Sequence, residues 1–144
     1  GQKKAPAGEL CKGMHLLVAE DNDLNYEVAS ELLALRDVTC DRAEDGAICV
    51  ERFNTAQPFT YNAILMDIQM PVMDGRTAAR TIRGLARPDA ADIPIYALSA
   101  DTCVEDERLS RENGMNGHLT KPIDFDALWQ IAQDIENRKE TAKR

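Results

Sequence analysis

The feature that most limits the fold of this chain is the regular alternation of short apolar runs with segments of helical period. Five runs have the length and composition of strands: "HLLVAE" (15–20), "VTCDRA" (38–43), "YNAILMD" (61–67), "IPIYALSA" (93–100) and "GHLTK" (117–121). Continuous apolar runs are typical of strands that helices cover on both faces. Strands that alternate with helices favour βαβ units around one parallel sheet.

Apolar residues three and four positions apart mark the helices predicted between these strands. The predicted core-facing stripes are Leu24, Val28, Leu32 and Leu35 in the first helix, Ala47, Val50 and Phe53 in the second, and Ala78, Ala79, Ile82 and Leu85 in the third. We expect Gly114 to end the fourth helix in the left-handed conformation. The segment 124–140 predicts a fifth helix that begins at an N-cap aspartate and becomes charged toward its end.

Five strands and five helices in strict alternation predict an α/β fold. We expect a doubly wound, five-stranded parallel sheet of flavodoxin-like order 2-1-3-4-5, flanked by five helices. The 144 residues are enough for one domain with a proper core. We assign residues 14–140 to this domain, residues 1–13 to an interdomain linker or an added tail, and residues 141–144 to a polar tail.

Polar side chains stand where the predicted strands end, and ligands of doubly wound folds bind beyond these carboxyl ends. The residues expected there are Glu20, Asp21, Asp67, Ser99 and Lys121. Asp67 follows the third strand, at the point where the strand order reverses. We therefore expect its side chain to be exposed in the ligand crevice.

The residue types in this crevice indicate phosphoryl chemistry. Three carboxylates brought together repel one another, which implies that a cation joins them. Oxygen ligands without His or Cys suit a hard ion such as Mg²⁺, for which Mn²⁺ can substitute, and Mg²⁺ commonly also binds substrate phosphate oxygens. Asp67 is placed to attack a phosphoryl group and form an acyl phosphate. Lys121 would supply positive charge, and the Ser99 hydroxyl would donate a hydrogen bond to a phosphoryl oxygen.

Charge and hydropathy restrict the partners of the chain. With 25 acidic and 17 basic residues, the net charge of -8 argues against nucleic-acid binding, because clustered Lys and Arg hold phosphate backbones. No apolar stretch approaches the roughly 18 residues of a membrane span, and the first ten residues lack the apolar core of a signal peptide. We expect a cytoplasmic domain without membrane contact of its own, although a longer parent protein is free to be membrane-anchored.

Four motifs occur together in the chain: "EDN" (20–22), "DIQMPVMDG" (67–75), "ALSA" (97–100) and "KP" (121–122). Their order and approximate spacing on a βα scaffold resemble the receiver domain of two-component response regulators, over nearly all of residues 14–136. The segments "VAEDNDLNYEVASELL" and "GMNGHLTKPID" look most like those of receivers in bacterial hybrid sensor histidine kinases, in which a receiver follows the kinase on one polypeptide. A free single-domain regulator would have much the same sequence.

The resemblance implies a phosphoacceptor in two-component or phosphorelay signal transduction. Asp67 would accept the phosphoryl group of a phosphohistidine, and Ser99 and Lys121 would respond to it. Four Mg²⁺ ligands are implied: Glu20, Asp21, Asp67 and the backbone carbonyl of Gln69. The Lys121–Pro122 bond would be cis. The isolated domain is not expected to be an enzyme beyond assisting its own phosphorylation and dephosphorylation, whereas a hybrid parent would be a histidine protein kinase.

Two residues depart from the family pattern. Glu20 stands where aspartate is commonest, and we expect its longer side chain still to reach the metal. His118 occupies the position where many members carry Tyr or Phe, an aromatic residue that swings inward when the Ser or Thr, here Ser99, closes on the phosphate. For His118, a switch that uses a moving imidazole and an exposed histidine without function are both open.

The expected partners are a histidine kinase, a histidine phosphotransfer domain or both, docking beside the first helix around residues 22–25, and a weak homodimer is left open. One alternative function is an aspartate phosphatase of the haloacid dehalogenase type. Gln69 argues against it, because that family has an acid/base aspartate two residues after the nucleophile. Another alternative is a receiver that only docks, independently of phosphorylation. Retention of Asp67, Ser99 and Lys121 together disfavours that reading.

Overall fold

The computed structural model describes residues 12–99, 104–121 and 125–142. Its elements are β1 (His15–Ala19), α2 (Asp23–Ala34), β2 (Thr39–Ala43), α3 (Gly46–Thr55), β3 (Ala63–Asp67), α4 (Gly75–Arg83), β4 (Ile95–Ser99), α5 (Val104–Glu112), β5 (Gly117–Thr120) and α6 (Phe125–Ala142). The strands form one sheet of order β2-β1-β3-β4-β5 in which all neighbours are parallel. The predicted doubly wound fold is therefore confirmed.

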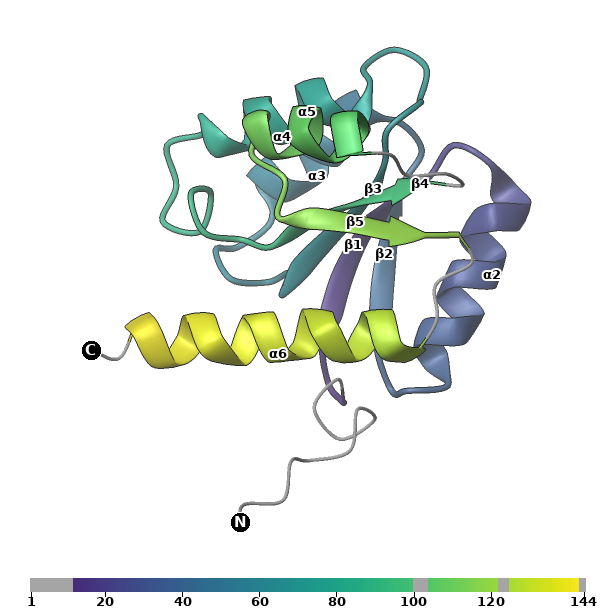
Figure 1. The fold of residues 1–144 in the computed structure, drawn as a ribbon, viewed down its shortest axis with the longest axis vertical. Helices are drawn as coiled ribbons and strands as arrows, with labels where there is room; N and C mark the ends of the chain where they lie inside the picture. The colour runs from purple at the N-terminus through teal and green to yellow at the C-terminus, as the bar shows by residue number, and fades with distance from the viewer. Residues whose placement is uncertain (1–11, 100–103, 122–124, 143–144) are drawn as a thin grey trace.

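Helices cover both faces of the sheet. Figure 1 shows α3, α4 and α5 on one face and α2 and α6 on the other. Successive strand residues point to opposite faces, so each face has its own apolar core. Leu16, Val18 and Leu65 pack in the cluster that includes α2 and α6, whereas Leu17 and Ile64 pack in the cluster that includes α3 and α4. Two covered faces explain why the strand sequences are apolar without a polar alternation.

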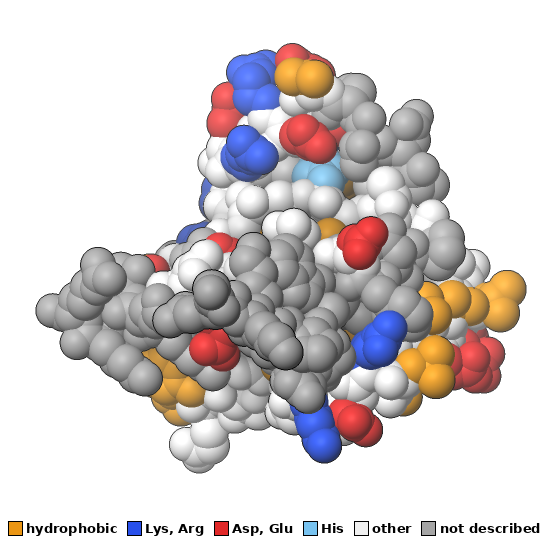
Figure 2. Space-filling model, turned by 60° about the horizontal axis from the view of Figure 1, so that its bottom comes forward, with side chains coloured by type: hydrophobic (Ala, Val, Ile, Leu, Met, Phe, Trp, Pro, Cys, Tyr) orange, Lys and Arg blue, Asp and Glu red, His pale blue; other side chains and the backbone are white. Residues whose placement is uncertain are grey.

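The predicted apolar stripe of α2 is wrong. Ala29 and Leu33 are buried, and Leu32 is partly buried. The side chains that face solvent are Leu24 (67% exposed), Val28 (39%) and Leu35 (70%). This helix carries apolar residues on more than one side, so its period does not reveal which side packs on the sheet. Figure 2 shows hydrophobic side chains gathered on the side of the molecule where α2 lies in Figure 1.

The stripes of α3 and α4 fit the prediction better. Phe53 of α3 is buried as predicted, but Ala47 and Val50 are only half-buried, and Gly46 and Cys49 are buried instead. In α4, the buried residues include the predicted Ala78, Ala79 and Ile82, and the half-buried Leu85 packs against them. In α3, two of the three buried positions therefore lie one residue earlier than predicted, and the third is as predicted.

Side-chain caps start the helices that begin close to strand ends. The Asn22, Asp45 and Asp74 side chains accept hydrogen bonds from the first turns of α2, α3 and α4. Such caps satisfy amide groups that lack a partner within the helix, so each helix has a fixed start. Gly114 has a φ of +94°, as expected for the glycine that follows α5.

The last helix runs from Phe125 to Ala142, two residues past its predicted end at 140, and its predicted N-cap at 124 lies outside the described residues. Within the described residues, the strands are one or two residues shorter than the apolar runs, because outer residues of the runs enter loops. Within the described ranges, no helix combines the length and the apolarity that a membrane crossing requires.

Candidate functional site

The register of the sheet brings the predicted site residues to one edge. Ala19 of β1 pairs with Met66 of β3, so Glu20 and Asp67 follow at the same level. The next pairs along the sheet are Asp67 with Leu98 and Ser99 with Thr120. Lys121 follows β5 directly, and its backbone N–H donates to the Ser99 carbonyl at 3.1 Å. Parallel strands thus place all of these ends together, as the sequence predicted.

Three carboxylates form an acidic cluster at this edge. Oxygens of Glu20, Asp21 and Asp67 all lie within 4.8 Å of one another. Glu20 is buried, Asp21 is exposed, and the Asp67 side chain is only 14% exposed, which corrects the expectation that it is openly exposed. The Lys121 ammonium covers one of its oxygens. Because the donor atoms are all carboxylate oxygens that repel one another, the residues fit a hard divalent cation such as Mg²⁺.

Lys121 joins two of these acids. Its Nζ lies 2.6 Å from Oε1 of Glu20 and 3.2 Å from Oδ2 of Asp67. Burial disfavours the charged amine, but the hydrogen bond to Glu20 and the charge of Asp67 outweigh it and raise the pKa of Lys121 above its ordinary value. The ammonium is therefore charged at neutral pH. It places a compact positive charge beside the predicted phosphoacceptor oxygen.

The loop after β3 is folded tightly against Asp67. The Gln69 N–H points to Asp67 Oδ1 at 3.4 Å, and the Gly75 N–H donates to the Ile68 carbonyl at 2.8 Å. A Cβ at Gly75 would lie 2.2 Å from the Asp67 carbonyl oxygen, so this close approach needs glycine. Val72 has a φ of +69°, which a β-branched residue rarely adopts. The loop after β3 is therefore a tight turn, and it contains a strained residue.

Sequence reasoning missed Gly46, which supports this loop from the start of α3. Its N–H donates to the Met73 carbonyl at 3.1 Å. A Cβ at this position would lie 2.2 Å from the Met73 carbonyl oxygen, closer than real side chains approach. The signal in the sequence is a glycine directly after the N-cap Asp45, a position where the absence of a side chain permits close backbone contact.

A cleft of about 430 Å³ opens beside Asp67. Its lining residues are Asp67, Ile68, Gln69, Arg76, Leu98, Ser99, Asp106 and Lys121. Arg76 and Asp106 were not among the predicted site residues. Arg76 donates from Nε to Ser110 Oγ at 3.2 Å and from Nη2 to the Asp106 carbonyl at 3.0 Å. The only sequence signal was an arginine in the first turn of the helix that follows the loop.

His118 lies beside this cleft but is not part of its lining. Its side chain is half-buried, and Nε2 lies 2.7 Å from Ser110 Oγ. Burial lowers the pKa of His118 below its ordinary value, so the imidazole is neutral at pH 7. His118 is therefore not the exposed residue of one alternative, whereas its role as a switch stays a prediction. The predicted cis bond before Pro122 falls on a residue outside the described ranges.

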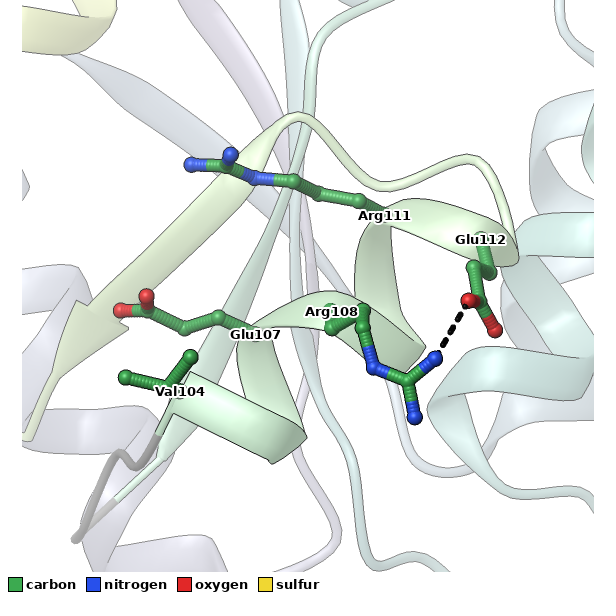
Figure 3. Close-up of a pocket in the computed structure, with 5 residues that line it drawn as sticks. All are labelled: Val104, Glu107, Arg108, Arg111 and Glu112. Atoms are coloured by element: carbon green, nitrogen blue, oxygen red, sulfur yellow. Dashed lines mark hydrogen bonds and ion pairs between the residues drawn. The ribbon is translucent and has the colours of Figure 1, made fainter.

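A second hollow of about 480 Å³ lies on the outer side of α5. Figure 3 shows its lining: Val104, Glu107, Arg108, Arg111 and Glu112. Arg108 forms ion pairs with Glu112, at 3.0 Å, and with Glu105 on the same helix. Val104 is 82% exposed. These contacts are those of a solvated helix surface, and we assign no chemistry to them.

Comparison with known proteins points to one family. The family model of the response regulator receiver domain matches residues 16–133. The peroxide stress-activated histidine kinase mak1 of Schizosaccharomyces pombe is 37% identical over 132 residues, which are 91% of this chain and 8% of that kinase. The chain thus spans a small part of this curated relative.

Solved structures are similar in both sequence and fold. The receiver domain of the sensor histidine kinase PA1611 from Pseudomonas aeruginosa PAO1, with magnesium coordinated in its active-site cleft, is 34% identical. Its TM-score is 0.72, over 84% of this chain and 95% of that one. Another similar chain comes from the co-crystal structure of the Saccharomyces cerevisiae histidine phosphotransfer protein Ypd1 and the Ssk1 receiver domain. It is 30% identical, and the match, with a TM-score of 0.68, covers 80% of this chain and 83% of that one.

Proposed function

This chain belongs to the response regulator receiver family, and we propose that Asp67 is the residue through which it receives a phosphoryl group and relays or switches a signal. It is a receiver domain of the kind found in hybrid histidine kinases and phosphorelay proteins. One observation carries the assignment of the residues: a nucleophile, an acidic cluster and a half-buried lysine converge at one sheet edge. The direct test is whether Asp67 of the purified domain takes up one labile phosphoryl group.

The proposed step is a transfer between two side chains. An Asp67 carboxylate oxygen attacks the phosphorus of a phosphohistidine, and the phosphorus–nitrogen bond breaks. The electron pair of that bond returns to the imidazole nitrogen, which takes up a proton from water. Lys121, 3.2 Å from Asp67 Oδ2, stabilises charge on the transferring group, and Ser99 donates a hydrogen bond to it.

The metal ligands in this proposal are Glu20, Asp21, Asp67 and the backbone carbonyl of Gln69. Bound Mg²⁺, or Mn²⁺ in its place, would offset the negative charge of the carboxylates and of the phosphoryl oxygens. Support comes from the spacing of the three carboxylates and from their oxygen-only donor set. The longer side chain of Glu20 reaches the cluster even though it also pairs with Lys121.

Asp21→Ala is expected to weaken Mg²⁺ binding by at least about tenfold while the fold stays intact. The residue is an exposed member of the cluster, so its side chain contributes charge to the ion without packing in the core. Metal titration followed by Trp fluorescence or by NMR would measure the change.

A suitable control is Asp23→Ala, which removes the same charge two residues away. Asp23 is 92% exposed and pairs with Arg42, outside the acidic cluster. Its loss should leave the metal affinity near the wild-type value, because exposed ion pairs contribute little. Equal affinities for wild type and Asp21→Ala would show that Asp21 is not a ligand.

We propose that residues 14–140 act as one domain within a hybrid histidine kinase and that the isolated domain does not turn over a substrate. Gln69 supports this view, because its amide cannot transfer the proton that rapid hydrolysis of an acyl phosphate needs. The same residue disfavours the haloacid dehalogenase alternative. The similar proteins described above come from two yeasts and one bacterium, so they give no support to the narrower prediction of a bacterial parent.

The proposed phosphodonor is a histidine phosphotransfer domain or the phosphohistidine helices of the parent kinase, docked on α2. This helix begins next to the acidic cluster, and Leu24 and Val28 expose apolar surface on its outer side. Val72, in the loop that follows β3, is 85% exposed. Exposed apolar side chains on α2 and in this loop suit the apolar face of partner helices.

Leu24→Glu is expected to slow phosphoryl transfer from a histidine phosphotransfer domain by about tenfold or more. A charge would replace an apolar side chain that the docked partner covers. Uptake from acetyl phosphate, which needs no docking, should be unchanged. Single-turnover transfer rates with both donors would measure the difference.

Leu35→Glu makes the same change at the far end of the helix. Leu35 is 70% exposed, similar to Leu24, but it lies about 16 Å farther along the axis. We expect wild-type rates with both donors. If the two variants slowed protein-mediated transfer equally, α2 would not be the docking surface next to Asp67.

A further inference from the structure

Arg76 connects the cleft beside Asp67 to α5. It belongs to the first turn of α4, its side chain is 22% exposed, and it lines the cleft together with Asp67 and Lys121. Its guanidinium donates to Ser110 Oγ and to the Asp106 carbonyl, at 3.2 and 3.0 Å. One side chain therefore reaches both the phosphoacceptor cleft and the neighbouring helix.

Ser110 extends this connection to β5. It is fully buried, and its Oγ lies within hydrogen-bond distance of Arg76 Nε and of His118 Nε2. The buried Nδ1 of His118 has no hydrogen-bond partner among the described residues. Arg76, Ser110 and His118 thus form a polar chain across α4, α5 and β5, which we call the arginine–serine–histidine chain. An unpaired polar atom is costly in a low-dielectric interior, so an arrangement of this chain that gives Nδ1 a partner would regain free energy.

The charge of Arg76 is partly neutralised by an ion pair with Asp106, whose Oδ1 lies 3.6 Å from Nη2. The closer contacts of the guanidinium, at 3.2 and 3.0 Å, are hydrogen bonds to the neutral Ser110 hydroxyl and the Asp106 backbone carbonyl. Lys121, the other cation of the cleft, already pairs with two carboxylates. A phosphoryl group on Asp67 would bring up to two negative charges and three acceptor oxygens. A guanidinium can donate two parallel hydrogen bonds to two oxygens of one phosphoryl group. A hydroxyl or a backbone carbonyl has only one oxygen and cannot accept such a pair.

We propose that Arg76 is the positioning residue that reports phosphorylation to α5 and β5. When Asp67 is phosphorylated, the Arg76 guanidinium turns from Ser110 and the Asp106 carbonyl to the phosphoryl oxygens, and Ser110 and His118 rearrange in response. This inference rests on the proposed function of Asp67. It adds a transmitting residue that lies outside the acidic cluster and outside the pair of Ser99 and Lys121.

The charged groups around His118 give the proposal a specific readout. Its pKa is lowered by burial first, and the positive charges of Arg76 on α4 and Arg111 on α5 lower it further, while Glu107 and Asp106 on α5 act in the opposite direction. If the Arg76 guanidinium moves away, the pKa of His118 should rise. The added negative charge at Asp67 also raises this pKa directly, so the movement of Arg76 is reported by the part of the rise that is lost when Arg76 is replaced.

The test is NMR of the whole chain with Mg²⁺, with and without beryllofluoride as the phosphoryl mimic. Shifts at Gln69 and Ser99 report binding of the mimic, and shifts over residues 104–112 and 117–120 report transmission. In wild type we expect both sets of shifts and a rise in the pKa of His118. In Arg76→Met we expect the shifts at Gln69 and Ser99 to remain and the transmitted shifts and that part of the pKa rise to be lost.

Arg80→Met is the matched control, because Arg80 is exposed one turn further along α4. It should behave as wild type. Ser110→Ala should retain the shifts at Gln69 and Ser99 and lose those of β5. If Arg76→Met does not fold, Arg76→Lys replaces it. Lys keeps the positive charge but lacks the planar group that donates two parallel hydrogen bonds, so we expect the same loss of transmission.

The outcomes separate this inference from the proposed function. Absence of shifts at Gln69 and Ser99 in wild type would overturn both. Shifts there, together with undiminished transmission and an unchanged pKa response in Arg76→Met or Arg76→Lys, would overturn only the role of Arg76.

Discussion

Asp67→Asn is expected to abolish phosphoryl uptake. Purified wild-type domain with Mg²⁺ and acetyl phosphate should gain one phosphoryl group, whereas the variant should gain none. The amide of Asn has the shape of the carboxylate but neither its charge nor its nucleophilic oxygen, so the fold should be retained while the reaction is lost. Intact-mass measurement would count the groups, and their release by hydroxylamine would identify an acyl phosphate.

Asp37→Asn is a control with the same chemical change. Asp37 is exposed, precedes β2 at the opposite end of the sheet, and has a φ of +58°, which Asn adopts readily. It should accept phosphate as wild type does. Unchanged labelling of Asp67→Asn would refute the assignment of the phosphoacceptor and leave the fold assignment untouched.

Gly46→Ala should have the second largest effect, a loss of about 1–3 kcal/mol of unfolding free energy. The added Cβ would lie 2.2 Å from the Met73 carbonyl oxygen, and the obstacle is backbone rather than a flexible side chain. Either α3 or the loop after β3 has to move. Since this loop also carries Gln69, we expect weaker Mg²⁺ binding as well. Urea denaturation would measure the stability change.

Gly84→Ala makes the same substitution at the end of α4. Its nearest neighbouring atom would lie 3.6 Å from the new Cβ, at ordinary contact distance, and its φ of -87° suits alanine. Stability should stay the same or rise slightly, because alanine restricts the unfolded chain. If both variants unfolded at the wild-type urea concentration, the contact between Gly46 and Met73 would not support the loop.

The sequence by itself determined the sheet, its strand order and the edge at which the site lies. Strands covered on both faces must be apolar along their whole length, so Ile64, Leu65 and Met66 identify a central strand. A carboxylate at the end of such a strand needs water or a partner of opposite charge, because an ionised group is costly to bury without a partner. The alternation of elements then placed Asp67, Ser99 and Lys121 at one edge. These inferences use only local pattern and chain topology.

Contacts between distant residues were decided by the tertiary structure alone. Lys121 and Glu20 are 101 residues apart in the chain, and Arg76 and Ser110 are 34 apart. The period of a helix gives the spacing of its apolar residues but not its rotation about its own axis. For that reason Leu24 and Val28 were assigned to the core, although packing on the sheet selects Ala29 and Leu33. Gly46 was missed because its close neighbour, Met73, lies far away in the sequence, in the loop after β3.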